Sequence, residues 1–200
     1  MLKNSILKRI FIVLSLFALA PSQAMEQVNT FSPVTKADLP MLFEWFQQPY
    51  IAELWKEPKD FKTFETKYLK QISTQYIIPF IAYIGNNPVA YIQYHHTNAE
   101  GRALVNDFTI PEKSVGFDLF IGNPEYLNKG HGTKLLKEFI AFVKTQEPEC
   151  QAIVIDPATD NDRAIACYKK AGFSTIGTYI VPWGPTGDGP GPVLMMIYYY

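Results

Sequence analysis

The sequence predicts one α/β domain, built as a mixed, twisted sheet of about six to seven strands with helices on both faces. Strand-like and helix-like hydrophobic patterns alternate along most of the chain. The turn signal 85–88 lies between two apolar runs and predicts an antiparallel hairpin. Later strands are separated by helices, as parallel crossovers require. The 200 residues, 48% of them hydrophobic, are enough for the core of a single domain.

The first half of the domain is expected to contain a short strand, two helices and the hairpin. Thr35 is the expected N-cap of the first helix, with Asp38 in place of the usual glutamate of a capping box. Pro49 is expected to end that helix. The expected elements are a strand at 31–34, helices from 39 to Pro49 and at 61–72, and hairpin strands at 80–84 and 89–94.

The second half alternates strands with helices before a final pair of strands. In the strand 115–121, residue alternation places Asp118 on the face opposite to Val115, Phe117, Leu119 and Ile121. The other expected elements are a helix at 133–144, a strand at 152–155, a helix from 159 or 160 to 170 with Gly172 at C′, and strands at 173–181 and 193–199. Long loops are expected at 97–114 and 182–192.

The first 24 residues have the three-part layout of a secretory signal peptide. A basic start precedes an apolar run from Ile10 to Ala20, and Ser22 and Ala24 are the small residues of a cleavage site. The run is too short to span a bilayer by itself, since a spanning helix needs about 20 residues. Two alternatives are an uncleaved membrane tether and a start of translation at Met25, which would leave the protein in the cytoplasm. The domain is expected over 28–200.

Charge and cysteine content exclude several classes of protein. The net charge of −1 gives no indication of nucleic-acid binding. The pair Cys150 and Cys167 cannot form a disulfide framework, so both are expected to be reduced and packed, with a single bridge as the alternative. No Cys/His cluster has the spacing of a zinc site, so no metal is expected. His95 and His96 are interpreted as solvated or core residues.

A glycine loop at 128–133 precedes the predicted helix 133–144. Gly130 and Gly132 permit tight turns and close approach of the backbone to a ligand. The first amides of a helix lack internal partners and favour an anion, most often phosphate. The spacing matches neither the dinucleotide fingerprint nor the P-loop. On the loop alone, an ordinary glycine-rich turn at the start of a helix remains an equal interpretation.

The loop and two later segments together resemble the GNAT acetyltransferase superfamily, and within it the aminoglycoside 6′-N-acetyltransferase branch most closely. The matching segments are Gly130–Leu135, Asp156–Pro157 and Asn161–Phe173. The resemblance covers roughly 31–177 and is strongest over 128–173. Leu127 departs from the general pyrophosphate motif of the family, which has Gln or Arg at this position. The resemblance therefore implies that backbone amides bind most of the pyrophosphate.

The resemblance implies acetyl-CoA as co-substrate, bound by the glycine loop, the end of the preceding strand and the helix that follows Asp156. The implied cofactor-binding residues are Phe120, Ile121, Lys129, Gly130, His131, Gly132, Thr133, Lys134, Asn161, Ala164 and Tyr168. Asn161 and Tyr168 each have a simpler alternative, as a local helix cap and as a core side chain.

The resemblance also implies catalytic and acceptor-binding residues. An ammonium has no lone pair, so a base must take its proton before it attacks a thioester. Asp118 is similar to the base of the family, and Tyr168 to the tyrosine beside the sulfur, a candidate general acid. Trp55, Asp118 and Asp156 are the expected acceptor-binding residues, because carboxylates complement a polycation. Asp118 and Asp156 can also be an ordinary strand residue and an ordinary turn residue.

The expected function is therefore transfer of acetyl from acetyl-CoA to a small-molecule amine, the 6′-amine of an aminoglycoside, with antibiotic resistance as the consequence. A siderophore precursor or a protein lysine is the alternative acceptor. A non-catalytic exported binding protein on the same scaffold is the alternative of another class. The sequence is compatible with a monomer or a homodimer.

Overall fold

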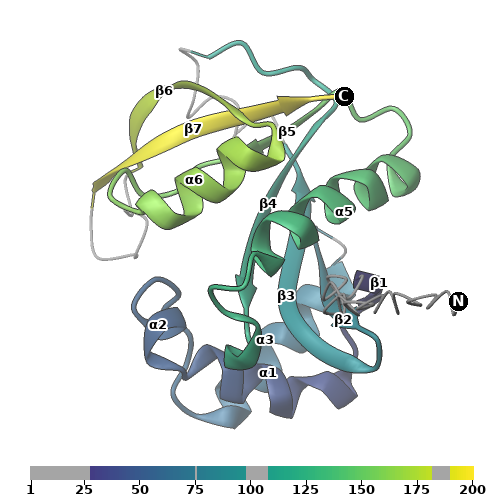
Figure 1. Ribbon diagram of the computed structural model, residues 1–200. Helices are drawn as coiled ribbons and strands as arrows, with labels where there is room; N and C mark the ends of the chain where they lie inside the picture. The colour runs from purple at the N-terminus through teal and green to yellow at the C-terminus, as the bar shows by residue number, and fades with distance from the viewer. Residues whose placement is uncertain (1–27, 75, 98–107, 182–189) are drawn as a thin grey trace, which may run out of the picture.

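Seven strands form a single sheet in the computed structural model, which describes residues 28–74, 76–97, 108–181 and 190–200 (Figure 1). Their order across the sheet is β1-β2-β3-β4-β5-β7-β6. Among the described strands, β4 and β5 are parallel and the other neighbours are antiparallel, which confirms the predicted mixed sheet. The strands are β1 (Val28–Pro33), β2 (Ile77–Ile84), β3 (Asn87–His96), β4 (Ser114–Ile121), β5 (Ala152–Ile155), β6 (Ser174–Val181) and β7 (Gly191–Tyr199).

Helices cover both faces of the sheet, as the sequence predicts. Helices α1 and α3 pack on the face that carries Ile81 and Tyr91. Helices α5 and α6 pack on the opposite face, against Ile92 and Phe117. In Figure 1, α1, α2 and α3 lie at one end of the molecule, and α6 lies with β6 and β7 at the other. The helices are α1 (Leu39–Phe46), α2 (Pro49–Ala52), α3 (Phe61–Thr74), α5 (His131–Gln146) and α6 (Asp162–Ala171), with 3-10 turns at Lys36–Asp38 and Pro124–Tyr126.

The two parallel strands pair over only part of their length. The pairing joins Ser114–Gly116 of β4 to Ala152–Val154 of β5. β4 nevertheless continues to Ile121, paired with β3 on its other side. The two strands therefore separate towards their C-terminal ends, and ligands of open α/β sheets bind at such ends. Gly122 follows β4 directly and packs so closely under Trp45 that a Cβ there would overlap the indole ring.

Several element boundaries differ from the sequence prediction. α5 begins at His131 rather than Thr133, because Gly130 adopts a left-handed φ of 81° and itself becomes the N-cap. The first helix ends at Phe46, and Pro49 does not terminate it but opens α2, since proline fits the first turn of a helix. β2 begins at Ile77, ahead of Pro79, whose carbonyl accepts a hydrogen bond from the Val34 amide at 2.9 Å.

Thr35 and Asp38 form the predicted capping box, but Thr35 caps the 3-10 turn Lys36–Asp38, and the N-cap of α1 is Asp38. The Asp38 carboxylate accepts hydrogen bonds from the Thr35 amide at 2.8 Å and the Thr35 hydroxyl at 2.7 Å. Cys150 and Cys167 are free thiols. The predicted signal segment, most of the loop 97–114 and most of the loop 182–192 lie outside the described residues.

Candidate functional site

The start of α5 has the geometry of an anion site. Asn128 and Gly130 both have left-handed backbone conformations, with φ of 59° and 81°. Gly130 caps the helix without a side-chain hydrogen bond. The start of α6 is different, because the Asn161 side chain accepts a hydrogen bond from the Ala164 amide at 3.1 Å. The N-cap Gly130 therefore offers the start of α5 no side-chain acceptor of its own, unlike Asn161 at α6, and an external anion can bind at such a helix start.

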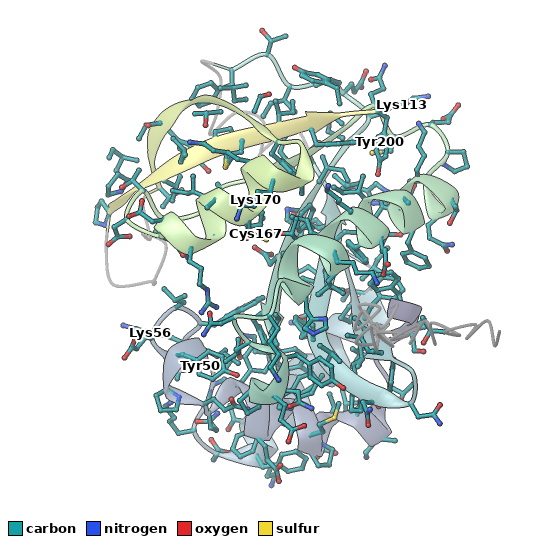
Figure 2. The ribbon with its side chains drawn as sticks, in the orientation of Figure 1. Tyr50, Lys56, Lys113, Cys167, Lys170 and Tyr200 are labelled. Atoms are coloured by element: carbon teal, nitrogen blue, oxygen red, sulfur yellow. The ribbon has the colours of Figure 1, made fainter. Side chains whose placement is uncertain are left out.

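The residues around this helix start come from three elements. A Cβ at Gly132 would lie 3.6 Å from Cys167 Sγ of α6 and 3.9 Å from Ile121 Cδ1 of β4. Thr133 Oγ1 and Cys167 Sγ are 3.3 Å apart. Cys167 projects from α6 into the region beside α5 (Figure 2). The structure thus places Ile121, Gly132 and Thr133 close together.

The loop is open above Gly130. At Gly130, an added Cβ would meet nothing within 4 Å. Lys129 and Gly130 are exposed, while Lys134 is half-buried. The His131 ring lies 5.2 Å from the Tyr126 ring, centroid to centroid, so the second residue of the predicted glycine motif packs against the preceding turn. The glycine loop and the first turn of α5 together form a cradle. It is open on its solvent side, and β4 and α6 close its other side.

Tyr168 of α6 lies beside the separated strands. Its side chain is buried, with its ring centroid 6.5 Å from that of Phe117 and 6.0 Å from that of Phe173. Burial raises the pKa of Tyr168, and the charges of Asp118, Cys167 and Asp156 raise it further. The tyrosine therefore keeps its proton at neutral pH and is available as a donor.

Two carboxylates lie on the face of the sheet opposite to Tyr168. Asp118 lies on β4, and Asp156 follows β5 directly. Burial raises the pKa of Asp156 to about 6, and the neighbouring charge of Asp118 adds to this shift. The Tyr179 hydroxyl of β6 donates to Asp156 Oδ2 at 2.8 Å, which favours the ionised form. The pair forms an acidic site at the end where β4 and β5 diverge.

Asp118 has a partner that the sequence analysis missed. Gln93 lies opposite Asp118 in the β3–β4 register, and its Nε2 donates to Asp118 Oδ2 at 2.9 Å. The Tyr91 hydroxyl in turn donates to Gln93 Oε1 at 2.6 Å. In the strand 89–94, alternation places a tyrosine and a glutamine on one face of an otherwise apolar strand. This polar pair was the sequence signal that could have pointed to a partner for Asp118. Tyr179, the partner of Asp156, was also missed.

Aromatic side chains border the carboxylates on the α1 and α3 side. Trp55 is half-buried, with ring centroids 5.3 Å from Phe120 and 5.8 Å from Tyr91. Phe120 stacks on Tyr91 at 5.4 Å. Trp55 therefore lies on the same side of the sheet as Asp118. The Phe120 side chain packs in this cluster, so the main chain of Phe120 is the part that remains for a cofactor.

Two further features are absent from the described part of the chain. No helix in the described ranges combines the length and apolar character needed to cross a membrane. Within the same ranges, no group of three or more His, Cys, Asp or Glu side chains could hold a metal ion.

Comparison with known proteins identifies the family. The acetyltransferase (GNAT) domain model matches residues 34–180. An aminoglycoside N(6′)-acetyltransferase type 1 of Klebsiella pneumoniae is 34% identical over 160 residues, which are 78% of this chain and 79% of the relative. A structure of AAC(6′)-Ib with paromomycin and acetyl-CoA superposes with a TM-score of 0.72 and 30% identity, covering 85% of this chain and 92% of that chain.

A second structure of AAC(6′)-Ib, with coenzyme A and kanamycin, has a TM-score of 0.71 and 32% identity and covers 85% of this chain and 94% of that chain. The matched range contains the glycine loop, both carboxylates and Tyr168. The chain belongs to the GNAT acetyltransferase family.

Proposed function

We propose that this acetyltransferase uses acetyl-CoA to acetylate the 6′-amine of an aminoglycoside. The observation that carries the proposal is the pair Asp118 and Asp156, on one face of the sheet at the divergence of β4 and β5. An acidic site beside Trp55 complements a polycationic, ring-shaped acceptor. The similarity to aminoglycoside N(6′)-acetyltransferase supports the same acceptor class.

In this proposal, the cofactor is held mainly by the backbone. The amides at the start of α5, where the N-cap is a glycine without a side chain, bind the pyrophosphate, with Thr133 and Lys134 beside them. The open space over Gly130 accommodates the phosphates, which a side chain would crowd. Ile121 and the main chain of Phe120 line the path from this cradle to the separated strands. Asn161 and Ala164 form the first turn of α6, on the other side of that path. Lys129 and His131 complete the set of proposed cofactor-binding residues.

The chemistry divides between Asp118 and Tyr168. Acetyl-CoA supplies a thioester carbonyl to a free amine. Asp118 takes the proton of the acceptor ammonium and thereby creates the lone pair that attacks. Attack forms the C–N bond, and collapse of the tetrahedral intermediate breaks the C–S bond. Tyr168, which burial keeps protonated, donates its proton to the departing sulfur and regains one from the acylated nitrogen, which loses its second proton. Asp156 and Trp55 orient the acceptor, with Asp156 ionised above about pH 6.

An assay of thiol release tests the function. Purified protein is incubated with acetyl-CoA and with kanamycin, spermidine, lysine or N6-hydroxylysine, and free coenzyme A is measured. We expect turnover with kanamycin and a product acetylated at the 6′-amine by mass spectrometry and NMR. Turnover with lysine or N6-hydroxylysine alone would replace the aminoglycoside by another amine. Acetyl-CoA binding without turnover on any amine would favour the non-catalytic scaffold.

We also propose that residues 1–24 are an export signal ahead of a domain at 28–200, and that the mature protein is a monomer or a homodimer. The basic start, the apolar run and the small residues at the cleavage position support this. N-terminal sequencing of the mature protein, with cell fractionation, separates a cleaved signal from a membrane tether and from a start at Met25. Light scattering gives the oligomeric state.

A further inference from the structure

A chain of hydrogen-bonded polar side chains, buried at its centre, connects α3 to Asp118 across one face of the sheet. Gln93 is at its centre and is 7% exposed. Its Oε1 accepts from the Tyr91 hydroxyl at 2.6 Å and from Gln71 Nε2 at 3.1 Å, while its Nε2 donates to Asp118 Oδ2 at 2.9 Å. Both ends of the Gln93 amide therefore have hydrogen-bond partners.

The polarity of these partners determines which way the Gln93 amide faces. An ionised carboxylate only accepts, and the Gln71 amide nitrogen only donates. Turning the Gln93 amide over would place its oxygen against Asp118 and its NH₂ against the Gln71 NH₂, and both contacts would repel. The Tyr91 hydroxyl also accepts a hydrogen bond from Gln71 Nε2 at 3.3 Å. Its own proton is therefore donated to Gln93. Gln93 must therefore present a donor to Asp118.

The donors behind Gln93 are themselves held in place. The Tyr91 side chain is fully buried, and its ring stacks on Phe120 at 5.4 Å. The neighbouring Tyr68 hydroxyl donates to the buried carboxylate of Glu57 at 3.2 Å, and Lys67 Nζ pairs with Glu57 at 2.6 Å. Hydrogen-bonded networks with a buried centre favour one arrangement, because an alternative leaves a buried polar group without a partner.

We propose that Gln93 is a positioning residue for the Asp118 carboxylate. It holds Oδ2 in one hydrogen bond, which fixes the plane of the carboxylate and leaves Oδ1 to accept the proton of the acceptor amine. This inference rests on the proposed role of Asp118 as the base. A hydrogen bond donated to a carboxylate favours its charged form in general, so loss of the donor is expected to move the acid limb of the rate profile to higher pH.

Other titratable groups interact electrostatically with Asp118, and all of them are retained in Gln93→Met, whereas Tyr91→Phe removes the Tyr91 hydroxyl. They are Tyr91 and His95 on β3, Asp156 after β5 and Tyr168 on α6. Because these groups are common to wild type and Gln93 variants, a difference in pH dependence between the proteins reports on the Gln93 donor.

The test compares Gln93→Met with Tyr91→Phe. Methionine keeps the length of the side chain without the donor, and phenylalanine keeps the ring without the hydroxyl. In kcat/KM for kanamycin against pH, we expect the acid limb of Gln93→Met to move up by about one pH unit, the size expected from one hydrogen bond to a charged group. Tyr91→Phe should move it in the same direction by less, since Gln71 still holds the amide.

Gln146→Met, at the exposed end of α5, is the matched control and should leave the profile unchanged. The KM for acetyl-CoA should change by less than about twofold in all three variants, because Gln93 is remote from the start of α5. A lower kcat with an unchanged pH profile, or an activity loss that follows a lower thermal midpoint, would overturn the positioning role.

A measurement without an acceptor separates this inference from the proposed function. With aspartate labelled at ¹³Cγ, the Asp118 signal is assigned by its disappearance in Asp118→Asn and is titrated by NMR. A titration that moves to higher pH in Gln93→Met supports the hydrogen-bond role even if no amine is acetylated. Superimposable titrations in wild type and Gln93→Met overturn it even in an active enzyme.

Discussion

The proposed cofactor side and the proposed acceptor side of the site are built from different parts of the chain. At the start of α5, backbone amides of neighbouring residues form the cradle, and Gly130 keeps it open. Around Asp118, the groups are side chains from β3, β4, β6 and the residue after β5. The first side depends on a local backbone shape, and the second depends on the register of the whole sheet. Substitutions should therefore affect one side without affecting the other.

The substitution Asp118→Asn should have the largest effect on the acceptor side while leaving the cofactor side unchanged. Asparagine keeps the size of the side chain but cannot take a proton at neutral pH, so we expect kcat with kanamycin to fall by about 100-fold or more. Acetyl-CoA affinity, measured by calorimetry, should stay within about twofold. Near wild-type turnover in this variant would assign the base to another group, and a parallel loss of acetyl-CoA affinity would show that the two sides are coupled.

The substitution Asp156→Asn tests how much the buried charge of Asp156 lowers the free energy of unfolding. Because burial raises the pKa of Asp156 from 3.8 to about 6, the native state binds this proton more tightly than the unfolded chain. This contribution to stability is complete below about pH 4 and is lost as the pH rises through about 6. We expect Asp156→Asn to unfold in urea with a free energy about 1–3 kcal/mol higher than wild type at pH 8.

At pH 4 the two proteins should have the same free energy of unfolding, since the carboxyl group then no longer carries the buried charge in the native state. The KM of the variant for kanamycin should rise at pH 8, because a charge that complements the acceptor has been removed. A stability difference that is independent of pH would show that ionisation of Asp156 is not its cause.

A pair of variants at Gly130 tests the cofactor side alone. Asparagine tolerates the left-handed conformation at this position, and aspartate has the same shape with a negative charge. The two side chains have the same size and differ only in charge, so the two variants should have similar stability. We expect acetyl-CoA to bind Gly130→Asp about 10-fold more weakly than Gly130→Asn, because the added carboxylate repels phosphate. Equal affinities would place the phosphates elsewhere.

The smallest effect is expected for Tyr179→Phe. The hydrogen bond from Tyr179 lowers the pKa of Asp156 relative to the value that burial alone would give, so its loss raises that pKa. In wild type, the KM for kanamycin should fall as the pH rises through about 6. In the variant, this fall should occur at a pH higher by less than about one unit. An unchanged KM profile would mean that Asp156 does not contribute its charge to acceptor binding.

The contrast between a local backbone motif and contacts that depend on the sheet register also explains which features could be predicted from the sequence. The glycine loop and the face of Asp118 follow from neighbouring residues, through a motif and through strand alternation, and the structure has both. The partners Gln93 and Tyr179 are separated from their aspartates by 25 and 23 residues, so finding them requires the strand pairing. α2 was missed because Pro49 can end one helix or begin another, and only packing decides between them.

The position of β7 has a consequence for the biosynthesis of the enzyme. β7 lies between β5 and β6 and pairs with both. Tyr179 of β6 therefore contacts Asp156, which follows β5, across a strand that is synthesised after both. A nascent chain can complete the cradle at α5 while the acceptor side is still unassembled. Chains cut short before Gly191 should therefore lack the Tyr179–Asp156 contact, and ribosome-bound chains should acquire acceptor binding last.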